Sequence, residues 1–168
     1  MYIQKLLDQN VISVVNSFKI KLLRDYKNTY NINNSTDFLN FLASSIIVSG
    51  QQIPIKSTNR FLVLFHDNPI WLTYSLFCTF FQLSHAYLLN PEKPEVPGSD
   101  IDQYHIFATI HRLRSYFPDK NLIQHCGQKL YKLNPGSSKL IIDYEYLKSF
   151  DSVLVSIPSS KHCHNIIN

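Results

Sequence analysis

The sequence predicts a mixed α/β fold. Two patterns indicate this class: short apolar runs that suit strands alternate along the chain with segments whose apolar residues recur at helical spacing. The 168 residues are 45% hydrophobic and 17% charged, which fits one domain, or one domain with extensions, around a buried core. With 4 Gly, 8 Pro and 3 Cys, the composition excludes collagen-like proteins and disulfide scaffolds.

The first elements lie at the N-terminus. Apolar residues at helical spacing in residues 1–16 predict an amphipathic helical extension. In residues 17–24, Phe18, Ile20 and Leu22 alternate with basic residues. This alternation predicts a strand with one buried face.

A helix and a long strand are expected next. Ser35 or Thr36 can cap a short helix with Asp37 in its first turn, where the helix dipole favours a carboxylate. Strand character resumes over Ser45–Ile55, and Gly50 in its middle indicates a bulge or bend.

Two further strands are predicted after a polar, basic tip at residues 56–60. Residues 61–65 form the first, and residues 66–69 form a turn. The extended apolar run at residues 80–89 is interpreted as the second.

The second half begins at a proline-rich boundary in residues 91–97. Residues 100–117 have helical spacing that ends at Pro118, and residues 142–150 suit a short helix. The run at residues 152–157 is strand-like.

A charge-free segment leaves two interpretations open. Residues 68–91 contain no Asp, Glu, Lys or Arg, and Ile70–Leu89 is about long enough to cross a bilayer. Gln82 and His85 within it favour burial in protein, where residues 80–89 would include paired strand. The alternative is one continuous membrane helix, in a single-span accessory subunit of an organellar respiratory complex.

Several runs together resemble the family of the tenth protein of the small ribosomal subunit. That family has an alternating apolar and basic first strand, a Gly-Pro-Ile-Pro strand, an Arg-Phe-Thr-Val-Leu strand, a strand that ends near Glu-Pro-Thr-Glu-Lys, and a short last strand. The corresponding runs here are Phe18–Leu22, Gly50–Ser57, Arg60–Leu64, Leu88–Lys93 and Ser152–Ile157. At Phe65–Leu72 this chain lacks the family's Ser-Pro-His-Val-Asn motif and the basic residues after it. The resemblance covers about half of the chain.

The resemblance implies a ferredoxin-like β-α-β-β-α-β fold, with a four-stranded antiparallel sheet backed by two helices. The domain would span residues 17–157 and be followed by a tail at 158–168. A hairpin at about residues 50–72 would leave the globule, and an insert at about 94–142 would be an addition to the core.

The function implied is that of a structural constituent of a mitochondrial small ribosomal subunit, in its head region and in the mitochondrial matrix. Its partners would be small-subunit rRNA and the third, ninth and fourteenth protein families of the same subunit. Ile, Asn, Lys, Phe and Tyr are abundant, and all five have A- and T-rich codons, which favours a small AT-rich genome such as that of an organelle. We expect no enzymatic activity, no cofactor, no membrane contact and no homo-oligomer.

Basic residues are the candidates for RNA contact. The net charge is +4, and the stretch from Tyr104 to Lys139 holds six basic residues against one acid. Such charges neutralise phosphates or simply form a solvated face. The candidates are Lys19, Lys21, Arg24, Lys56, Arg60, Arg112, Arg114, Lys129 and Lys132.

Possible metal ligands are present without a metal-site spacing. His125 and Cys126 are adjacent, as are His162, Cys163 and His164, but no Cys-x-x-Cys pair occurs. We therefore expect no metal site, and no sequence motif of a known catalytic class is present either.

Overall fold

Four strands form the central sheet of the computed structural model, which describes residues 2–148 without the side chains of residues 2–4, 6 and 7. They are β1 (Ser45–Ile55), β2 (Thr58–Phe65), β3 (Asn68–Leu72) and β7 (Lys139–Ile142), in the order β3-β2-β1-β7. The pairs β1–β2 and β2–β3 are antiparallel, whereas β7 runs parallel to β1. The mixed α/β class is confirmed, but the sheet is mixed and not wholly antiparallel as expected.

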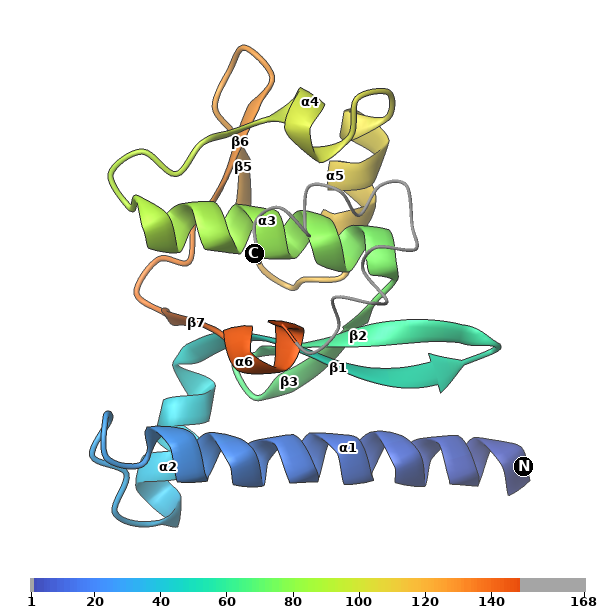
Figure 1. The fold of residues 1–168 in the computed structure, drawn as a ribbon, viewed down its shortest axis with the longest axis vertical. Coiled ribbons are helices and arrows are strands. Elements are labelled where there is room, and N and C mark those ends of the chain that lie inside the picture. The colour runs from blue at the N-terminus through green and yellow to red at the C-terminus, as the bar shows by residue number, and fades with distance from the viewer. Residues whose placement is uncertain (1, 149–168) are drawn as a thin grey trace.

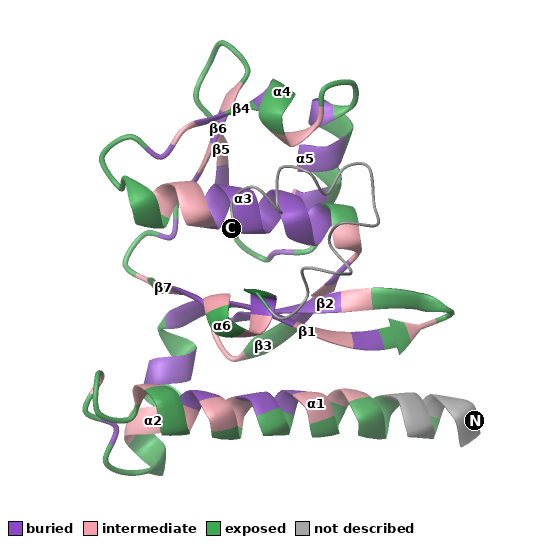
Figure 2. Cartoon of the chain, viewed as in Figure 1, coloured by how far each residue is buried: buried purple, intermediate pink, exposed green. Residues whose placement is uncertain are grey.

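Both faces of this sheet are buried (Figure 2). Successive residues of a strand point to opposite faces. Accordingly, Ile46 and Val63 belong to the core on one side, and Ile47 and Leu62 to the core on the other. Burial on both faces explains why these strands are continuous apolar runs and do not alternate with polar residues.

Two helices cover one face of the sheet, α1 (Tyr2–Tyr26) and α2 (Ser35–Ala43) (Figure 1). The predicted helix at α2 is confirmed, with Asp37 in its first turn. Its N-cap is Asn34, one residue before the expected position, because the Asn34 side chain accepts a hydrogen bond from the Asp37 amide at 2.8 Å.

The predicted strand at residues 17–24 is wrong, because α1 continues through it without a break. Phe18 and Leu22 are each 2% exposed, whereas Ile20 is 71% exposed. A strand would place all three side chains on one face, but a helix places positions three or four apart together and turns Ile20 away. The spacing of Val15, Phe18 and Leu22 continues the helical pattern of the N-terminal residues, and this longer period determines the structure.

The opposite face of the sheet is covered by α3 (Tyr74–Leu89), so the predicted strand at residues 80–89 is also wrong. The charge-free segment is divided between β3 and this helix. Every residue from Leu76 to Ser84 is buried, since α3 lies between the sheet and a further layer of structure (Figure 1). A helix that is apolar on all sides needs such an environment.

The further layer contains α4 (Gly98–Ile101), α5 (Ile106–Ser115) and a small antiparallel sheet. Its strands are β4 (Val96–Pro97), β5 (Ile123–His125) and β6 (Leu130–Leu133), in the order β4-β6-β5. A short helix, α6 (Tyr144–Lys148), follows β7 and confirms the short helix predicted there.

The single helix predicted at residues 100–117 is two helices, separated at Asp102. The Asp102 carboxylate accepts hydrogen bonds from the amides of Tyr104 and His105 and from the Thr109 hydroxyl. The two hydrogen bonds from amides form a turn ahead of α5, so the chain leaves α4 and begins a new helix at Ile106.

The segment expected to be an insert at residues 94–142 is part of the core. Its last four residues are β7, a strand of the central sheet. Ile110, Leu113 and Phe117 belong to the same buried cluster as α3 and the sheet. The strand predicted at 152–157 and the tail at 158–168 lie outside the described residues.

The β1–β2 hairpin spans residues 45–65 and not 50–72. Its tip, at residues 56–58, is exposed to solvent. Lys56 and Ser57 form the turn with positive φ values of 48° and 64°, as a two-residue hairpin loop requires. The irregularity predicted at Gly50 is confirmed by a register shift between Val48 and Gln52.

We expect the period of α1 to show in its mutational profile. Phe18→Ala should lower the free energy of unfolding by about 3–5 kcal/mol, because it empties a buried site. Ile20→Ala should change it by less than about 0.5 kcal/mol, because that side chain is exposed. Urea denaturation of both variants measures the difference, and equal losses would indicate the strand.

We expect Gly50→Ala to destabilise the protein more than Gly136→Ala. Both glycines have positive φ, 76° and 61°, which costs a residue with a Cβ about 1–2 kcal/mol. A Cβ at Gly50 would also overlap Leu147, whereas nothing lies within 4 Å of one at Gly136. Overpacking adds about 1–3 kcal/mol to the Gly50 variant alone. Thermal unfolding of the two variants should therefore differ, and equal shifts in Tm would contradict the close packing of α6 on β1.

Candidate nucleic-acid interface

The three candidate residues on α1 are engaged in ion pairs within the protein. Lys19 Nζ lies 2.6 Å from Asp67 Oδ1, in the turn between β2 and β3. Lys21 Nζ lies 2.6 Å from Asp143 Oδ2, at the end of β7. Arg24 pairs with its neighbour Asp25 at 3.1 Å, and the arginine is mostly exposed. Lys19 and Lys21 thus attach α1 to the central sheet.

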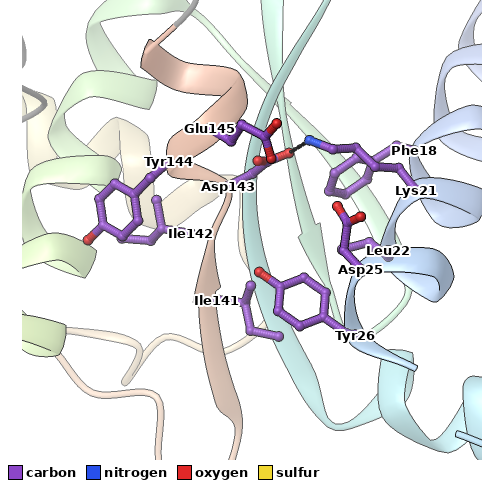
Figure 3. Close-up of a pocket in the computed structure, with 10 residues that line it drawn as sticks. All are labelled: Phe18, Lys21, Leu22, Asp25, Tyr26, Ile141, Ile142, Asp143, Tyr144 and Glu145. Atoms are coloured by element: carbon purple, nitrogen blue, oxygen red, sulfur yellow. Dashed lines mark hydrogen bonds and ion pairs between the residues drawn. The ribbon is translucent and has the colours of Figure 1, made fainter. Parts of the chain in front are cut away.

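Figure 3 shows the cleft in which Lys21 and Asp143 meet, a cavity of about 330 Å³ between α1 and the end of β7. Asp25 and Glu145 also line it, so three carboxylates face one ammonium group. Burial raises the pKa of Tyr26, and the nearby Asp143, Tyr30 and Asp25 raise it further. The tyrosine keeps its proton, and the cleft as a whole repels a phosphate.

Arg114 forms hydrogen bonds within the fold. Its Nε and Nη2 atoms both donate to the carbonyl oxygen of Ile123, at 3.0 and 2.8 Å. This pair of hydrogen bonds joins α5 to β5. Together with the three residues on α1, Arg114 is a candidate whose charge is engaged within the fold.

Lys129 and Lys132 lie on the β5–β6 hairpin. Lys129 is exposed in its turn with φ of 60°, and its carbonyl oxygen accepts from the Gly98 amide at 2.7 Å. Lys132 is half-buried on β6 opposite Gln124. Within residues 2–148 neither lysine forms an ion pair, so both charges face solvent or a partner.

Arg60 and Arg112, which are far apart in the sequence, are both associated with Tyr116. Arg60 on β2 donates from Nη1 to the Tyr116 hydroxyl at 3.2 Å. Tyr116 and Arg112, at the C-terminal end of α5, line a cavity of about 320 Å³. Lys56 lies further along the same hairpin, at its exposed tip.

Hydroxyl groups and a helix start complete this basic cavity. Thr73 and Ser115 line it, together with the apolar side chain of Leu76. Thr73 is the N-cap of α3, and its side chain makes no capping hydrogen bond. The first amides of α3 add positive potential at the same place. The combination of arginine, hydroxyl and amide donors suits a phosphate group.

The acid that precedes α5 is held in its charged form. Burial alone would raise the pKa of Asp102, but hydrogen bonds from the His105 amide, the Thr109 hydroxyl and the Tyr104 amide lower it overall. These donors solvate the carboxylate, which therefore keeps its negative charge.

Sequence analysis did not identify Phe107, an exposed aromatic residue on α5. Ile106, Ile110 and Leu113 fill the buried side of α5, which leaves Phe107 exposed by 64%. Of the two tyrosines that interleave with the basic residues, Tyr116 is 38% exposed, whereas Tyr131 is buried. The helical period of this segment could have indicated that Phe107 is exposed, because three other apolar residues already fill the inner face of the helix.

The possible metal ligands do not gather in the part of the chain that the structure describes. Within residues 2–148, no three His, Cys, Asp or Glu side chains lie close enough to hold a metal ion. His125 and Cys126 are exposed at the end of β5. The trio His162, Cys163 and His164 lies outside the described residues.

No helix in residues 2–148 combines the length and the apolar character needed to cross a membrane.

Comparisons with known proteins identify no relative: no protein-family model matches the chain, and neither a curated protein nor a solved structure is similar to it.

We expect Arg114 and Arg112 to differ in their effect on stability. Arg114→Gln should lower the free energy of unfolding by about 1–3 kcal/mol, because the variant cannot form the two hydrogen bonds from a charged donor. Arg112→Gln should change it by no more than about 0.5 kcal/mol, because that side chain is exposed and unpaired within the described residues. Urea denaturation measures both, and a larger decrease for the Arg112 variant would contradict these roles.

Proposed function

We propose that this protein is a non-enzymatic, RNA-binding structural component of a ribonucleoprotein particle, and that the particle is the small subunit of a mitochondrial ribosome. The observation that carries the proposal is that Tyr116 accepts a hydrogen bond from Arg60 and lines the same cavity as Arg112. The β1–β2 hairpin and α5 supply one arginine each, so the folded chain assembles a basic site from two distant segments.

The physical argument concerns the phosphate backbone. Arg60 and Arg112 can neutralise phosphates, and the neighbouring Thr73 hydroxyl can donate to a phosphate oxygen. Lys56 adds a charge at the exposed tip of the hairpin, where an RNA helix can approach without displacing the fold. Such contacts hold a protein on RNA without selecting a base sequence.

The choice of a mitochondrial ribosome rests on the abundance of residues whose codons are rich in A and T, and on the resemblance of the hairpin segment from Gly50 to Leu64. A ferredoxin-like core would need strands at residues 17–24 and 80–89, and both segments are helical here. The proposal therefore draws on the hairpin and its charges, not on the strand-by-strand alignment. The partners proposed are small-subunit rRNA and the third, ninth and fourteenth proteins of the subunit head.

The titratable groups away from this site have roles in packing. His85 Nδ1 lies 2.6 Å from the Tyr144 hydroxyl, and burial lowers the pKa of the histidine. Its ring also stacks on Phe81. This pair joins α3 to α6, and we assign it no catalytic step.

We expect the purified protein to bind a transcript of mitochondrial small-subunit rRNA with a strong dependence on salt. The double variant Arg60→Gln/Arg112→Gln should bind more weakly, and the slope of log K against log salt should fall by about 0.7–0.9 for each phosphate that the protein no longer neutralises. The control is Lys27→Gln/Lys93→Gln, which removes two exposed charges elsewhere and should leave the slope near that of the wild type.

Sedimentation of organelle lysates on sucrose gradients tests the particle. The protein should migrate with the small subunit and shift to the top of the gradient after ribonuclease treatment. Retention in the membrane pellet after carbonate extraction, or a wild-type protein that binds no RNA, would overturn the proposal.

A further inference from the structure

We propose that α5 binds single-stranded RNA, with an unpaired base stacked on Phe107 on one flank of the helix and a phosphate held by Arg112 on the other. This inference rests on the proposed RNA binding and specifies the form of RNA that the site accepts. It is carried by two hollows that lie on opposite sides of one short helix.

The first hollow is aromatic. It has a volume of about 160 Å³ and is lined by Phe107, Ile110, Arg114, His125 and Tyr131. The His125 and Tyr131 rings lie with centroids 5.0 Å apart, and the His125 side chain is exposed. Aromatic rings beside a guanidinium plane are the surroundings in which proteins stack unpaired bases.

Phe107 is available to stack on a base because the fold does not use it. The side chain is 64% exposed, and the buried side of α5 is complete without it. Tyr104, just before the helix, is 80% exposed and adds a second aromatic side chain to the same region of the surface.

The second hollow is the basic cavity of Arg112, Ser115, Tyr116, Thr73 and Leu76. On a helix of 3.6 residues per turn, Phe107 and Arg112 point about 140° apart, so a strand must cross α5 to reach both. His111 lies between them on the exposed side.

This geometry favours a single strand over a duplex. A base on one flank and a phosphate on the other require a backbone whose bases are splayed away from their neighbours. The bases of an A-form helix are stacked and paired, and its major groove is too narrow for side chains to enter. The charges favour RNA over a protein occupant, because Arg112 lines this hollow, Arg60 bonds to Tyr116 at its edge, and both can neutralise phosphates.

The test compares binding of a labelled single-stranded oligouridine with a blunt RNA duplex by fluorescence anisotropy. Phe107→Ala should weaken binding of the single strand on the order of tenfold, the usual effect of removing one base stack, while its salt dependence stays unchanged. Phe107→Trp should restore the affinity. Arg112→Gln should instead reduce both the affinity and the salt slope.

Leu39→Ala is the matched control, because it truncates another exposed apolar residue, on α2, and should leave binding unchanged. Thermal unfolding of each variant distinguishes a folded protein that binds RNA weakly from a protein that is unfolded. Equal binding of the single strand by wild type and Phe107→Ala, or a duplex bound as tightly as the single strand, would overturn this inference alone.

Two further outcomes are distinguishable. If the wild type binds neither RNA form in a salt-dependent manner, the proposed function fails together with the inference. If Phe107→Ala keeps its RNA affinity but no longer incorporates into the particle, the exposed aromatic residues bind a protein, which overturns the assignment to a base.

Discussion

The architecture depends on the burial of α3 from both sides. Its Phe77 ring stacks on Phe61 of the central sheet, and its Phe80 ring stacks on Phe117 of the outer layer. Two buried hydroxyls within it are satisfied locally: Thr79 and Ser84 donate to carbonyl oxygens one turn earlier. The central part of α3, from Leu76 to Ser84, is buried on all sides, so the layer built from residues 96–133 is required to cover it.

The same constraint separates what sequence analysis could predict of the fold from what it could not. The pattern at β1 and the cap near Asp37 are local, and both were predicted. The run at 80–89 is uncharged and mostly apolar, and period alone cannot distinguish a buried strand from a helix buried on all sides. Within residues 17–24, apolar and basic residues alternate over five positions, as in a strand. Only the exposure of Ile20 shows that the segment follows the longer helical period.

The candidate interface was predicted as a set of charges, but their use depends on tertiary contacts. The sequence alone does not distinguish Lys19 and Lys21 from Lys56. Their ion-pair partners, Asp67 and Asp143, lie in segments that follow much later in the chain. Arg114 and Arg112 differ in the same way, since only the first reaches the Ile123 carbonyl. Which cations remain available is a property of the complete fold, and composition does not determine it.

The parallel pairing of β1 with β7 affects how the chain can fold during synthesis. Ser45–Val48 must wait for Lys139–Ile142, about ninety positions later, before that edge of β1 is paired. Until then the hairpin exposes unpaired backbone groups beside a strongly apolar sheet, a condition that favours association with other chains. Pairing across such a separation is intrinsically slow, because the intervening loop must close first. A nascent chain of this protein therefore has a long interval in which a chaperone or an early binding partner would protect it.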